Sequence, residues 1–296
     1  MGKRKQAFCH TRAFWMFVLP ALLLFSVFFI LPLILSIGFS FTDYDGWKTM
    51  NFTGLQNYTK LLSSGEVYKT LGRTFGYALF SLPFKVIVPL LIAVLATTKY
   101  CKGITVVRTI SYLPVLISAL VVGITINWMF GQEYGLINFI IQSLGGEPLQ
   151  WALNPMLATF VVSFASNWAS TGFYMIMFIG GINNISRELY EASSLDGANT
   201  WQRFRYITWP QLQPTTFFVT IILTINCFKV YDIVYMLAGG NTGGLNESAI
   251  VLVYHIYEEA FRNWNLGYAS AVSMVLFLIV LAITLVQFRG EKKYAN

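Results

Sequence analysis

Six apolar segments set the main constraint on how this chain can fold. They span residues 14–39, 74–97, 106–130, 155–182, 215–238 and 266–288. A helix needs about 20 residues to cross a hydrocarbon core of ~30 Å, and each segment is long enough. Backbone groups inside a bilayer must find their hydrogen bonds within the protein, so we expect these segments to be helices. The sequence therefore predicts an all-α, polytopic membrane protein with six transmembrane helices.

The composition agrees with this fold class. Hydrophobic residues make up 56% of the 296 residues and charged residues only 11%, whereas soluble domains carry about 25% charged residues. The first segment is longer than the ~7–15-residue apolar region of a signal peptide, and we interpret it as a retained span. The three cysteines are widely separated and show no metal-ligand spacing, so no metal site is predicted.

The positive charges predict the orientation of the spans. Thirteen Lys and Arg residues lie on one side of the membrane, five lie on the other, and Lys85 and Lys229 fall inside spans. Because Lys and Arg concentrate on the cytoplasmic side, the basic N-terminus 1–13, the loop 183–213 and the C-terminus are expected in the cytoplasm. The net charge of +7 thus reflects membrane topology and not nucleic-acid binding.

The loop 183–213 departs from the apolar pattern. Ser186 is placed to cap a helix, and Gly197 is placed to end it in a left-handed conformation. Asn199 and Gln202 match the reciprocal cap of a second short helix. The first helix carries an apolar stripe at helical spacing, formed by Ile185, Leu189, Ala192 and Leu195. The pattern predicts two short amphipathic helices at the cytoplasmic surface.

Such helices can dock into a groove on another protein or rest on lipid. Helices that rest on lipid usually carry a strongly basic polar face. Here Glu188, Glu191 and Asp196 stand against Arg187. The acidic balance favours a protein partner.

The same loop carries a recognisable motif. Glu191-Ala192 is followed by Asp196-Gly197 and then by Ile207-Thr208-Trp209-Pro210. This order resembles the Glu-Ala-Ala coupling motif of the permease subunits of bacterial ABC importers, with Ser193 in place of the second Ala and Trp209 in place of a Leu. Four further segments resemble the carbohydrate branch of these permeases, which includes the maltose, lactose and glycerol-phosphate permeases. They are residues 189–193, 228–232, 237–240 and 260–271.

The resemblance implies a type I ABC importer permease fold over residues 14–296. It implies a translocation subunit for a sugar or oligosaccharide in the bacterial cytoplasmic membrane. The implied partners are a second, homologous permease subunit, two cytoplasmic ATPase subunits and an extracytoplasmic solute-binding protein. The chain itself would have no catalytic residue and no cofactor, because ATP and Mg would be bound by the ATPase subunits.

An alternative function is an ion-coupled secondary transporter that works without an ATPase. The sequence shows no convincing internal repeat, although many secondary transporters are built from one. A carrier of this kind would also have no need of the polar insert at 183–213. Both observations favour the importer.

Three sets of residues are predicted to carry the function. The ATPase-coupling residues are Glu191, Ala192, Asp196, Gly197, Ile207 and Pro210. The substrate-pathway residues, carried over by position on the helices before and after the loop, are Ser170, Phe173, Asn226 and Lys229. The residues expected to contact the binding protein are Glu258, Glu259 and Arg262, on a predicted outward helix at 247–262.

Three charges inside the spans are left with open roles. Lys229 and Asp232 are three residues apart, so on one helix they would share a face and pair, which we favour over direct contact of Lys229 with an acidic sugar. Lys85 lies near the middle of the second span between two prolines, where it either lines the pathway or contacts the partner permease.

Overall fold

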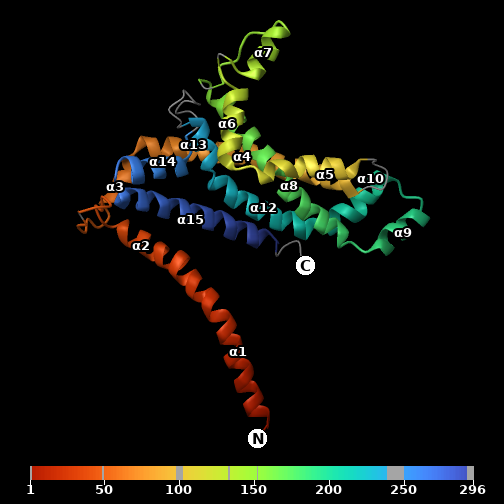
Figure 1. Cartoon of the computed structure of the whole chain (residues 1–296), viewed down its shortest axis with the longest axis horizontal. Coiled ribbons are helices and arrows are strands. Elements are labelled where there is room, and N and C mark those ends of the chain that lie inside the picture. Colours follow the sequence, from red (N-terminus) through yellow and green to blue (C-terminus); the bar gives the residue numbers. More distant parts are fainter. Residues whose placement is uncertain are drawn as a thin grey trace. The chain divides into compact units, whose positions relative to one another are not determined.

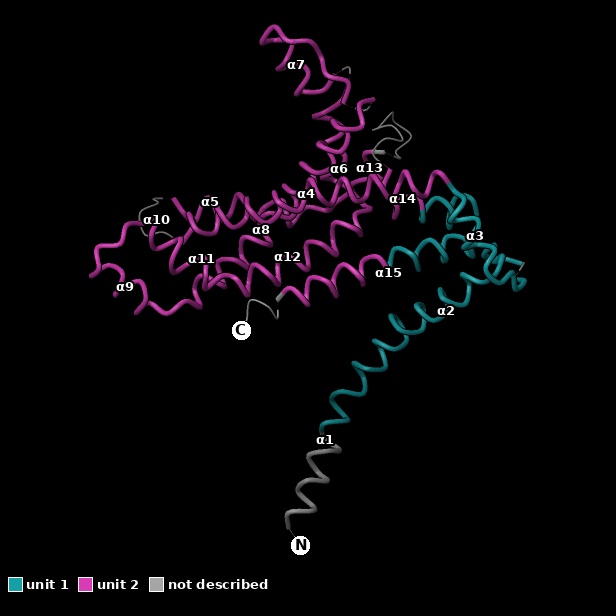
Figure 2. Tube along the Cα trace, turned by 180° about the vertical axis from the view of Figure 1, so that it is seen from behind, with its two compact units in different colours: residues 1–64, 256–278 teal, residues 65–255, 279–296 magenta. Residues whose placement is uncertain are grey.

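The computed structural model describes residues 2–48, 50–97, 103–132, 134–151, 153–238 and 250–291, with side chains between Phe14 and Gly290. These residues are helical apart from turns, loops and one isolated antiparallel bridge between Thr42 and Phe52, so the all-α prediction is confirmed. The chain divides into two compact units (Figure 2). Unit 1 comprises residues 1–64 and 256–278, and unit 2 comprises residues 65–255 and 279–296.

Unit 1 begins with a long apolar helix. α1 (Gly2–Phe25), the π-helical turn η1 (Ser26–Ile30) and α2 (Leu31–Phe39) follow one another without a break and match the expected first span. No residue of η1 or α2 is buried. An apolar helix whose surface is this exposed needs lipid or another protein around it. The unit also contains α3 (Gln56–Ser63), η5 (Glu258–Arg262) and the first part of α15 (Leu266–Glu291).

Unit 2 is organised around α8 (Pro155–Asn183). This helix contacts α4 (Gly65–Thr97) most extensively and also contacts α12 (Gln213–Phe228), as Figure 1 shows. Further contacts of α8 are with α5 (Ile104–Tyr112), η2 (Leu113–Leu116), α6 (Ala119–Met129) and α13 (Asp232–Ala238). Gly172 allows α8 to approach α5 closely, because a Cβ at this position would collide with the Ser111 carbonyl oxygen.

A hydrophobic core joins the three long helices of unit 2. Its buried members come from α4, α8, α12 and the two ends of the loop between α8 and α12. They are Leu90, Ala93, Tyr174, Met175, Phe178, Ile182, Ile185, Leu212, Val219 and Leu223. The remaining elements are α7 (Leu136–Ser143), α9 (Arg187–Leu195), α10 (Thr200–Arg203), η3 (Phe204–Thr208), α11 (Trp209–Gln211) and α14 (Leu252–Tyr257). Because the core includes both ends of this loop, the loop is anchored to the spans.

Four stretches of the described chain are long and apolar enough to cross a membrane. They are Phe14–Phe39, Gly65–Thr97, Gln213–Leu237 and Leu266–Gly290, and a bent pair of helices adds a possible fifth. The remaining expected span, 155–182, the fourth along the chain, coincides with α8, which has 29 residues but does not reach the hydropathy of those four stretches. The structure is therefore compatible with the six predicted spans.

The third expected span, 106–130, is not a single straight helix. The segments Ile104–Leu116 and Ala119–Met129 are bent by 102° relative to each other (Figure 1). Ile117 between them is extended, and Ser118 caps the second helix by accepting a hydrogen bond from the Leu120 amide at 3.3 Å. The expectation of one continuous helix is wrong because this local cap starts a new one.

The fifth expected span is also interrupted. α12 ends at Phe228 and α13 begins at Asp232, so Lys229 and Asp232 do not share a face of one helix. No ion pair joins them in the described part of the chain, and that prediction is wrong. Asp232 instead lies in the first turn of α13, where a negative charge stabilises the positive end of a helix.

Candidate functional site

The loop between α8 and α12 begins with the predicted helix. Ser186 starts α9, and its Oγ accepts a hydrogen bond from the Glu188 amide at 3.3 Å. Gly197 ends the helix with a φ of 74°, in the left-handed region. The Ala198 amide then donates to the Ser193 carbonyl at 2.9 Å, which closes the C-terminal cap. The predicted start and end of this helix are confirmed.

The second predicted cap is present as well. The Gln202 amide donates to Asn199 Oδ1 at 2.9 Å, and the Asn199 amide donates to Gln202 Oε1 at 2.8 Å. This reciprocal pair begins α10, which continues through η3 into α11. Pro210 lies in the first turn of α11, where its missing N–H costs no hydrogen bond.

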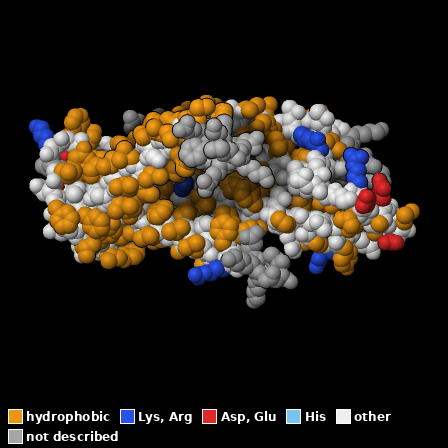
Figure 3. All heavy atoms as spheres, turned by 90° about the horizontal axis from the view of Figure 1, so that it is seen from below, with side chains coloured by type: hydrophobic (Ala, Val, Ile, Leu, Met, Phe, Trp, Pro, Cys, Tyr) orange, Lys and Arg blue, Asp and Glu red, His pale blue; other side chains and the backbone are white. Residues whose placement is uncertain are grey.

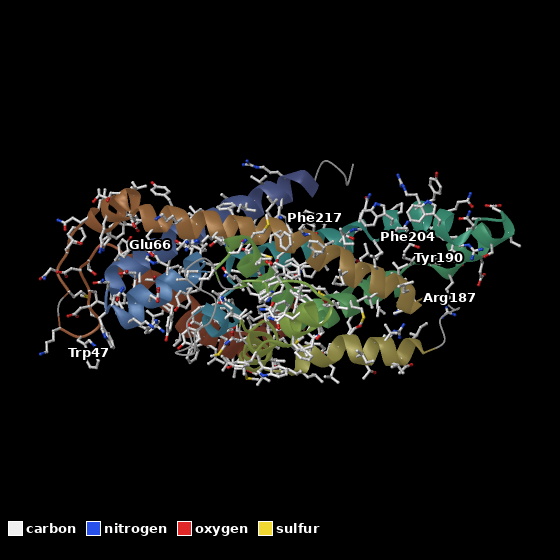
Figure 4. All side chains as sticks on the ribbon, turned by 90° about the horizontal axis from the view of Figure 1, so that it is seen from above. Trp47, Glu66, Arg187, Tyr190, Phe204 and Phe217 are labelled. Atoms are coloured by element: carbon white, nitrogen blue, oxygen red, sulfur yellow. The ribbon has the colours of Figure 1, made fainter. Side chains whose placement is uncertain are left out.

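A hydrogen bond joins the two halves of the loop. The Tyr190 hydroxyl on α9 and Thr208 Oγ1 at the end of η3 are 2.9 Å apart. Tyr190, Ile207 and Trp209 also pack against the hydrophobic core of unit 2. In Figure 4 Tyr190 and Phe204 lie at the end of unit 2 opposite Glu66. The loop is therefore held firmly at one end of the long helices.

The outer surface of the loop carries large apolar side chains and charges of both signs. Leu195, Tyr206 and Trp201 are 91%, 73% and 69% exposed. Glu191 and Asp196 are exposed, and neither is in an ion pair within the described residues. On the face drawn in Figure 3 most acidic side chains gather at the end that holds α9 and α10. Exposed large apolar side chains of this kind are found on surfaces that contact another protein or a membrane.

The predicted coupling residues separate into two sets. Glu191, Ala192, Asp196 and Gly197 are exposed along the second half of α9 and its cap, and Pro210 is exposed on α11. Ile207 instead packs against the core, so it fastens the loop and does not contribute to its outer surface. Its apolar side chain, within a polar insert, is the sequence signal for this anchoring role. Tyr190, Thr208 and Trp209 also anchor the loop, and the sequence pattern did not predict their role.

The predicted pathway residues lie where α8 and α12 meet. Asn226 Nδ2 on α12 donates to the Tyr174 hydroxyl on α8 at 2.9 Å. Phe173 is 49% exposed and contacts the Tyr174 ring edge to face, with centroids 5.3 Å apart. Lys229 is exposed and directly follows the last residue of α12. Of the predicted pathway residues, Asn226 thus contacts the facing helix, whereas the ring contact of Phe173 is with its own neighbour Tyr174.

Lys85 belongs to the same region. It is 5% exposed, and its Nζ donates to Ser166 Oγ on α8 at 2.7 Å and to the Tyr77 hydroxyl at 3.5 Å. The Ser166 carbonyl also accepts a hydrogen bond from Ser170 Oγ at 2.7 Å. These side chains form what we term the polar cluster: Tyr77, Lys85, Ser166, Ser170, Tyr174 and Asn226.

The residues predicted to contact a binding protein are grouped on η5 in unit 1. Arg262 Nη1 lies 3.2 Å from Glu258 Oε1. The Glu259 carboxylate accepts hydrogen bonds from Asn263 Nδ2 at 3.1 Å and from Asn265 Nδ2 at 3.0 Å. Glu259 thus shapes the turn after η5, whereas Glu258 is held only by its pair. Helix is confirmed from Leu252 to Arg262, and residues 239–249 of this expected outer loop lie outside the described residues.

Metal-ligating side chains do not cluster in the described part of the chain. The described residues contain no group of three His, Cys, Asp or Glu side chains placed to hold a metal ion. A hollow of about 480 Å³ in unit 2 has mainly aromatic and aliphatic walls. Its aromatic lining comes from Phe80, Phe84, Phe160, Phe164 and Trp168.

Comparison with known proteins gives a consistent result. Residues 53–293 match the family model described as "Binding-protein-dependent transport system inner membrane component". The chain is 32% identical to the arabinooligosaccharides transport system permease protein AraP of Bacillus subtilis, over 98% of this chain and 94% of that protein. It is 32% identical to the trehalose/maltose transport system permease protein MalF of Thermococcus litoralis, over 93% and 92%. It is also 32% identical to the lactose transport system permease protein LacF of Rhizobium radiobacter, over 94% of each.

Solved structures show the same fold. A bacterial ABC transporter involved in the import of the acidic polysaccharide alginate contains a chain that superposes with a TM-score of 0.86 at 22% identity, covering 99% of this chain and all of that chain. The alginate transporter in complex with its pentasaccharide-bound periplasmic protein gives a TM-score of 0.83 at 23% identity, covering 95% and 94%. At this level of identity the superposition establishes the permease fold, and the fold includes both the loop and the long helices of unit 2.

Proposed function

The chain belongs to the family of binding-protein-dependent transport system inner membrane components, and from this membership we propose that it is the translocation subunit of an ATP-driven importer for a sugar or oligosaccharide. The sugar class is supported by the relatives that carry arabinooligosaccharides, trehalose or maltose, and lactose. An ion-coupled carrier without an ATPase is not favoured, because these relatives span nearly the whole chain.

The exposed apolar surface of the loop between α8 and α12 is the observation that carries this proposal. Leu195 and Trp201 are exposed on a loop whose two halves are joined by the Tyr190–Thr208 hydrogen bond and whose two ends pack in the core of the long helices. A rigid apolar projection of this kind fits a groove on a cytoplasmic ATPase subunit. ATP and Mg would be bound by two such subunits, and this chain would hold no nucleotide. The basic N-terminus, the loop and the C-terminus lie in the cytoplasm in this arrangement.

Coupling then follows from how the loop is attached. Ile185 and Leu212 at its two ends belong to the same buried core as Tyr174 and Leu223. Displacement of the loop by the ATPase would therefore shift α8 and α12 together, because packed helices move as units. The pathway residues lie on these two helices. Asn226 and Ser170 would offer hydrogen bonds to sugar hydroxyls, and Phe173 would offer an aromatic platform.

Two further partners complete the proposed assembly. A second, homologous permease subunit would cover the exposed first span. An extracytoplasmic solute-binding protein would deliver the sugar at the opposite end of the spans and contact η5 through Glu258, Glu259 and Arg262. Exposed charges of this kind give salt-sensitive, transient contacts.

Co-purification tests the proposal at the loop. The tagged chain should retain an ATPase in stoichiometric amount from solubilised membranes, and the cells should take up a labelled sugar in an ATP-dependent manner. Leu195→Ser should weaken ATPase retention at least about tenfold, because docking buries a leucine side chain and such burial contributes ~1.5–3 kcal/mol. Leu144→Ser is the matched control, since Leu144 is 83% exposed at the C-terminal end of α7.

Two outcomes would contradict the proposal. One is a chain that reaches the membrane without any associated ATPase. The other is equal retention by both leucine variants, which would place the docking surface elsewhere.

A further inference from the structure

The polar cluster contains a buried cation that the proposed function leaves without a role. Lys85 is 5% exposed, and its partners are two hydroxyl groups, those of Ser166 and Tyr77. No carboxylate lies within ion-pair distance of it in the described part of the chain. An ammonium group has three N–H donors and is costly to bury without an anion. Ser81, one turn earlier on α4, is also fully buried and its hydroxyl has no partner.

This cation contacts α8, one of the two helices that carry the predicted pathway residues. Ser166, which accepts the hydrogen bond from Lys85, also accepts the one from Ser170. The Tyr174 hydroxyl is within electrostatic range of the Lys85 ammonium and holds Asn226. Of the four predicted pathway residues, Ser170 bonds to the carbonyl of the residue whose hydroxyl holds Lys85, and Asn226 bonds to the Tyr174 hydroxyl.

The surrounding helices supply almost no negative charge. α8 and α12 contain no Asp or Glu, and α4 contains only Glu66, in its first turn. A second cation, Lys229, is exposed three residues after Asn226 at the break between α12 and α13. No described carboxylate forms an ion pair with Lys229. Asp232, exposed at the start of α13, is the nearest carboxylate to Lys229 along the chain, and among the described residues neither Asp232 nor Glu66 is in an ion pair with Lys85 or Lys229.

We propose that the pathway prefers sugars that carry a carboxylate or phosphate group, and that Lys85 sets this preference. The inference rests on the proposed function as a sugar importer. Because Lys85 is buried, it acts through its field and through the hydroxyl groups that it orients, and it is a positioning residue. A unit charge about 10 Å away, at an effective dielectric constant of ~20, changes the occupancy of an anionic group by about tenfold. A neutral sugar can use the same amide and hydroxyl partners without this gain.

The test uses the complete transporter, with its partner permease, ATPase subunits and binding protein, reconstituted in liposomes. Uptake is measured for two matched pairs, digalacturonate with its methyl ester and trehalose 6-phosphate with trehalose. The readout is the acid-to-neutral ratio of a variant divided by that of the parent. Because every variant shares one binding protein, the selectivity of that protein cancels. The two pairs separate a carboxylate from a phosphate preference.

Lys85→Gln should lower the acid-to-neutral ratio about tenfold for the preferred pair, and Lys85→Arg should restore it. Lys69→Gln is the control, since Lys69 is exposed on the same helix and should leave the ratio unchanged. Lys229→Gln should lower the ratio about threefold and provides a second variant if Lys85→Gln does not assemble. An unchanged ratio in every assembled variant overturns the inference.

Uptake by the parent transporter separates failure of the acid preference from failure of the proposed function. ATP-driven uptake confined to the neutral members leaves the proposed function intact and refutes the acid preference. Absence of ATP-driven uptake for all four sugars, with the complex assembled, refutes the proposed function and with it this inference. Faster uptake of either acidic member by the parent than by Lys85→Gln, with the neutral member unaffected, supports it.

Discussion

The loop between α8 and α12 exposes large apolar side chains, whereas the polar cluster buries polar and charged ones. In the loop, Leu195 and Trp201 are exposed on the outer surface. In the polar cluster, Lys85 and Ser166 are buried between helices. An exposed apolar patch and a buried polar group are the two informative exceptions to ordinary packing. Each points to something that the single chain lacks, an apolar groove at the loop and a polar solute at the cluster.

The two regions are parts of one mechanical unit. α8 and α12 carry the cluster along their length and the loop between their ends. The hydrophobic core that holds Tyr190 and Ile207 also contains Tyr174. Substitutions in the loop, in the polar cluster and in the contacts within the loop should therefore have different effects on ATPase retention and on transport. The following substitutions are chosen to measure these effects separately.

The largest effect on transport is expected at Gly197, in the loop. Gly197→Val places a β-branched residue at a φ of 74°, which costs ~1–2 kcal/mol and should unwind the end of α9. We expect ATP-driven uptake to fall about thirtyfold while the protein stays in the membrane. Gly103→Val is the control, because Gly103 has a φ of 89° and, like Gly197, open space around a Cβ. Normal uptake by Gly197→Val would remove the loop from the coupling mechanism.

Asn226→Ala tests the other side of the comparison. The substitution leaves the Tyr174 hydroxyl without its donor and removes a proposed hydrogen bond to the sugar. We expect uptake to fall about tenfold, corresponding to ~1.4 kcal/mol, with assembly and basal ATPase activity unchanged. Thr220→Ala serves as control, because the Thr220 hydroxyl bonds only to its own helix at Thr216. Parental uptake across sugar concentrations by both Asn226→Ala and Lys229→Gln would place the pathway elsewhere.

Tyr190→Phe sharpens the comparison by releasing the two halves of the loop from each other, while the polar cluster and the packing of the loop against the core stay in place. It removes the hydrogen bond to Thr208 and keeps the ring that packs against the core. A hydrogen bond of this kind contributes ~0.5–1.5 kcal/mol, so transport per ATP hydrolysed should fall about threefold with ATPase retention preserved. The exposed Tyr206 supplies the control, Tyr206→Phe. Equal loss of retention and transport would show that the hydrogen bond supports docking and not transmission.

The smallest effect on transport is expected for substitutions on η5, where Glu258 and Arg262 form an ion pair. Glu258→Lys breaks the pair with Arg262 and should lower stimulation by the binding protein about twofold at low salt, with no effect at high salt. Glu259→Lys should lower it at both, because Glu259 also fixes Asn263 and Asn265. Glu147→Lys is the exposed control. Full stimulation of both η5 variants at low salt would exclude this surface.

Local chemistry explains what the sequence could predict. Ser186, Gly197 and the Asn199–Gln202 cap act on amides within a few residues of themselves, so their pattern determines the two short helices directly. The apolar segments likewise predict helices, because a bilayer leaves the backbone no other partner. The family motif added the roles of these elements.

The missed features depend on contacts between distant residues or on the direction of a helix. Tyr190 and Thr208 are 18 positions apart, and Lys85 and Ser166 are 81 apart, so no local pattern announces either contact. Hydropathy measures how apolar a segment is and is insensitive to a bend. It therefore predicts one span across residues 106–130, although the helix breaks at Ser118. The break after Phe228 contains neither Gly nor Pro. It therefore carried no recognisable stop signal.

The polar composition of α8 has a consequence for how the protein enters the membrane. A helix that carries Ser163, Ser166, Asn167 and Ser170 partitions less readily into lipid than the spans before and after it. In the folded unit Ser166 contacts Lys85 of α4, Ser163 and Asn167 line the hollow that α8 shares with α4, α5 and η2, and α12 also packs on α8. Stable insertion of α8 therefore depends on α4, which is synthesised earlier, and on α12, which is synthesised later. The spans of this chain therefore do not insert independently of one another, and α8 is the segment whose insertion most depends on the others.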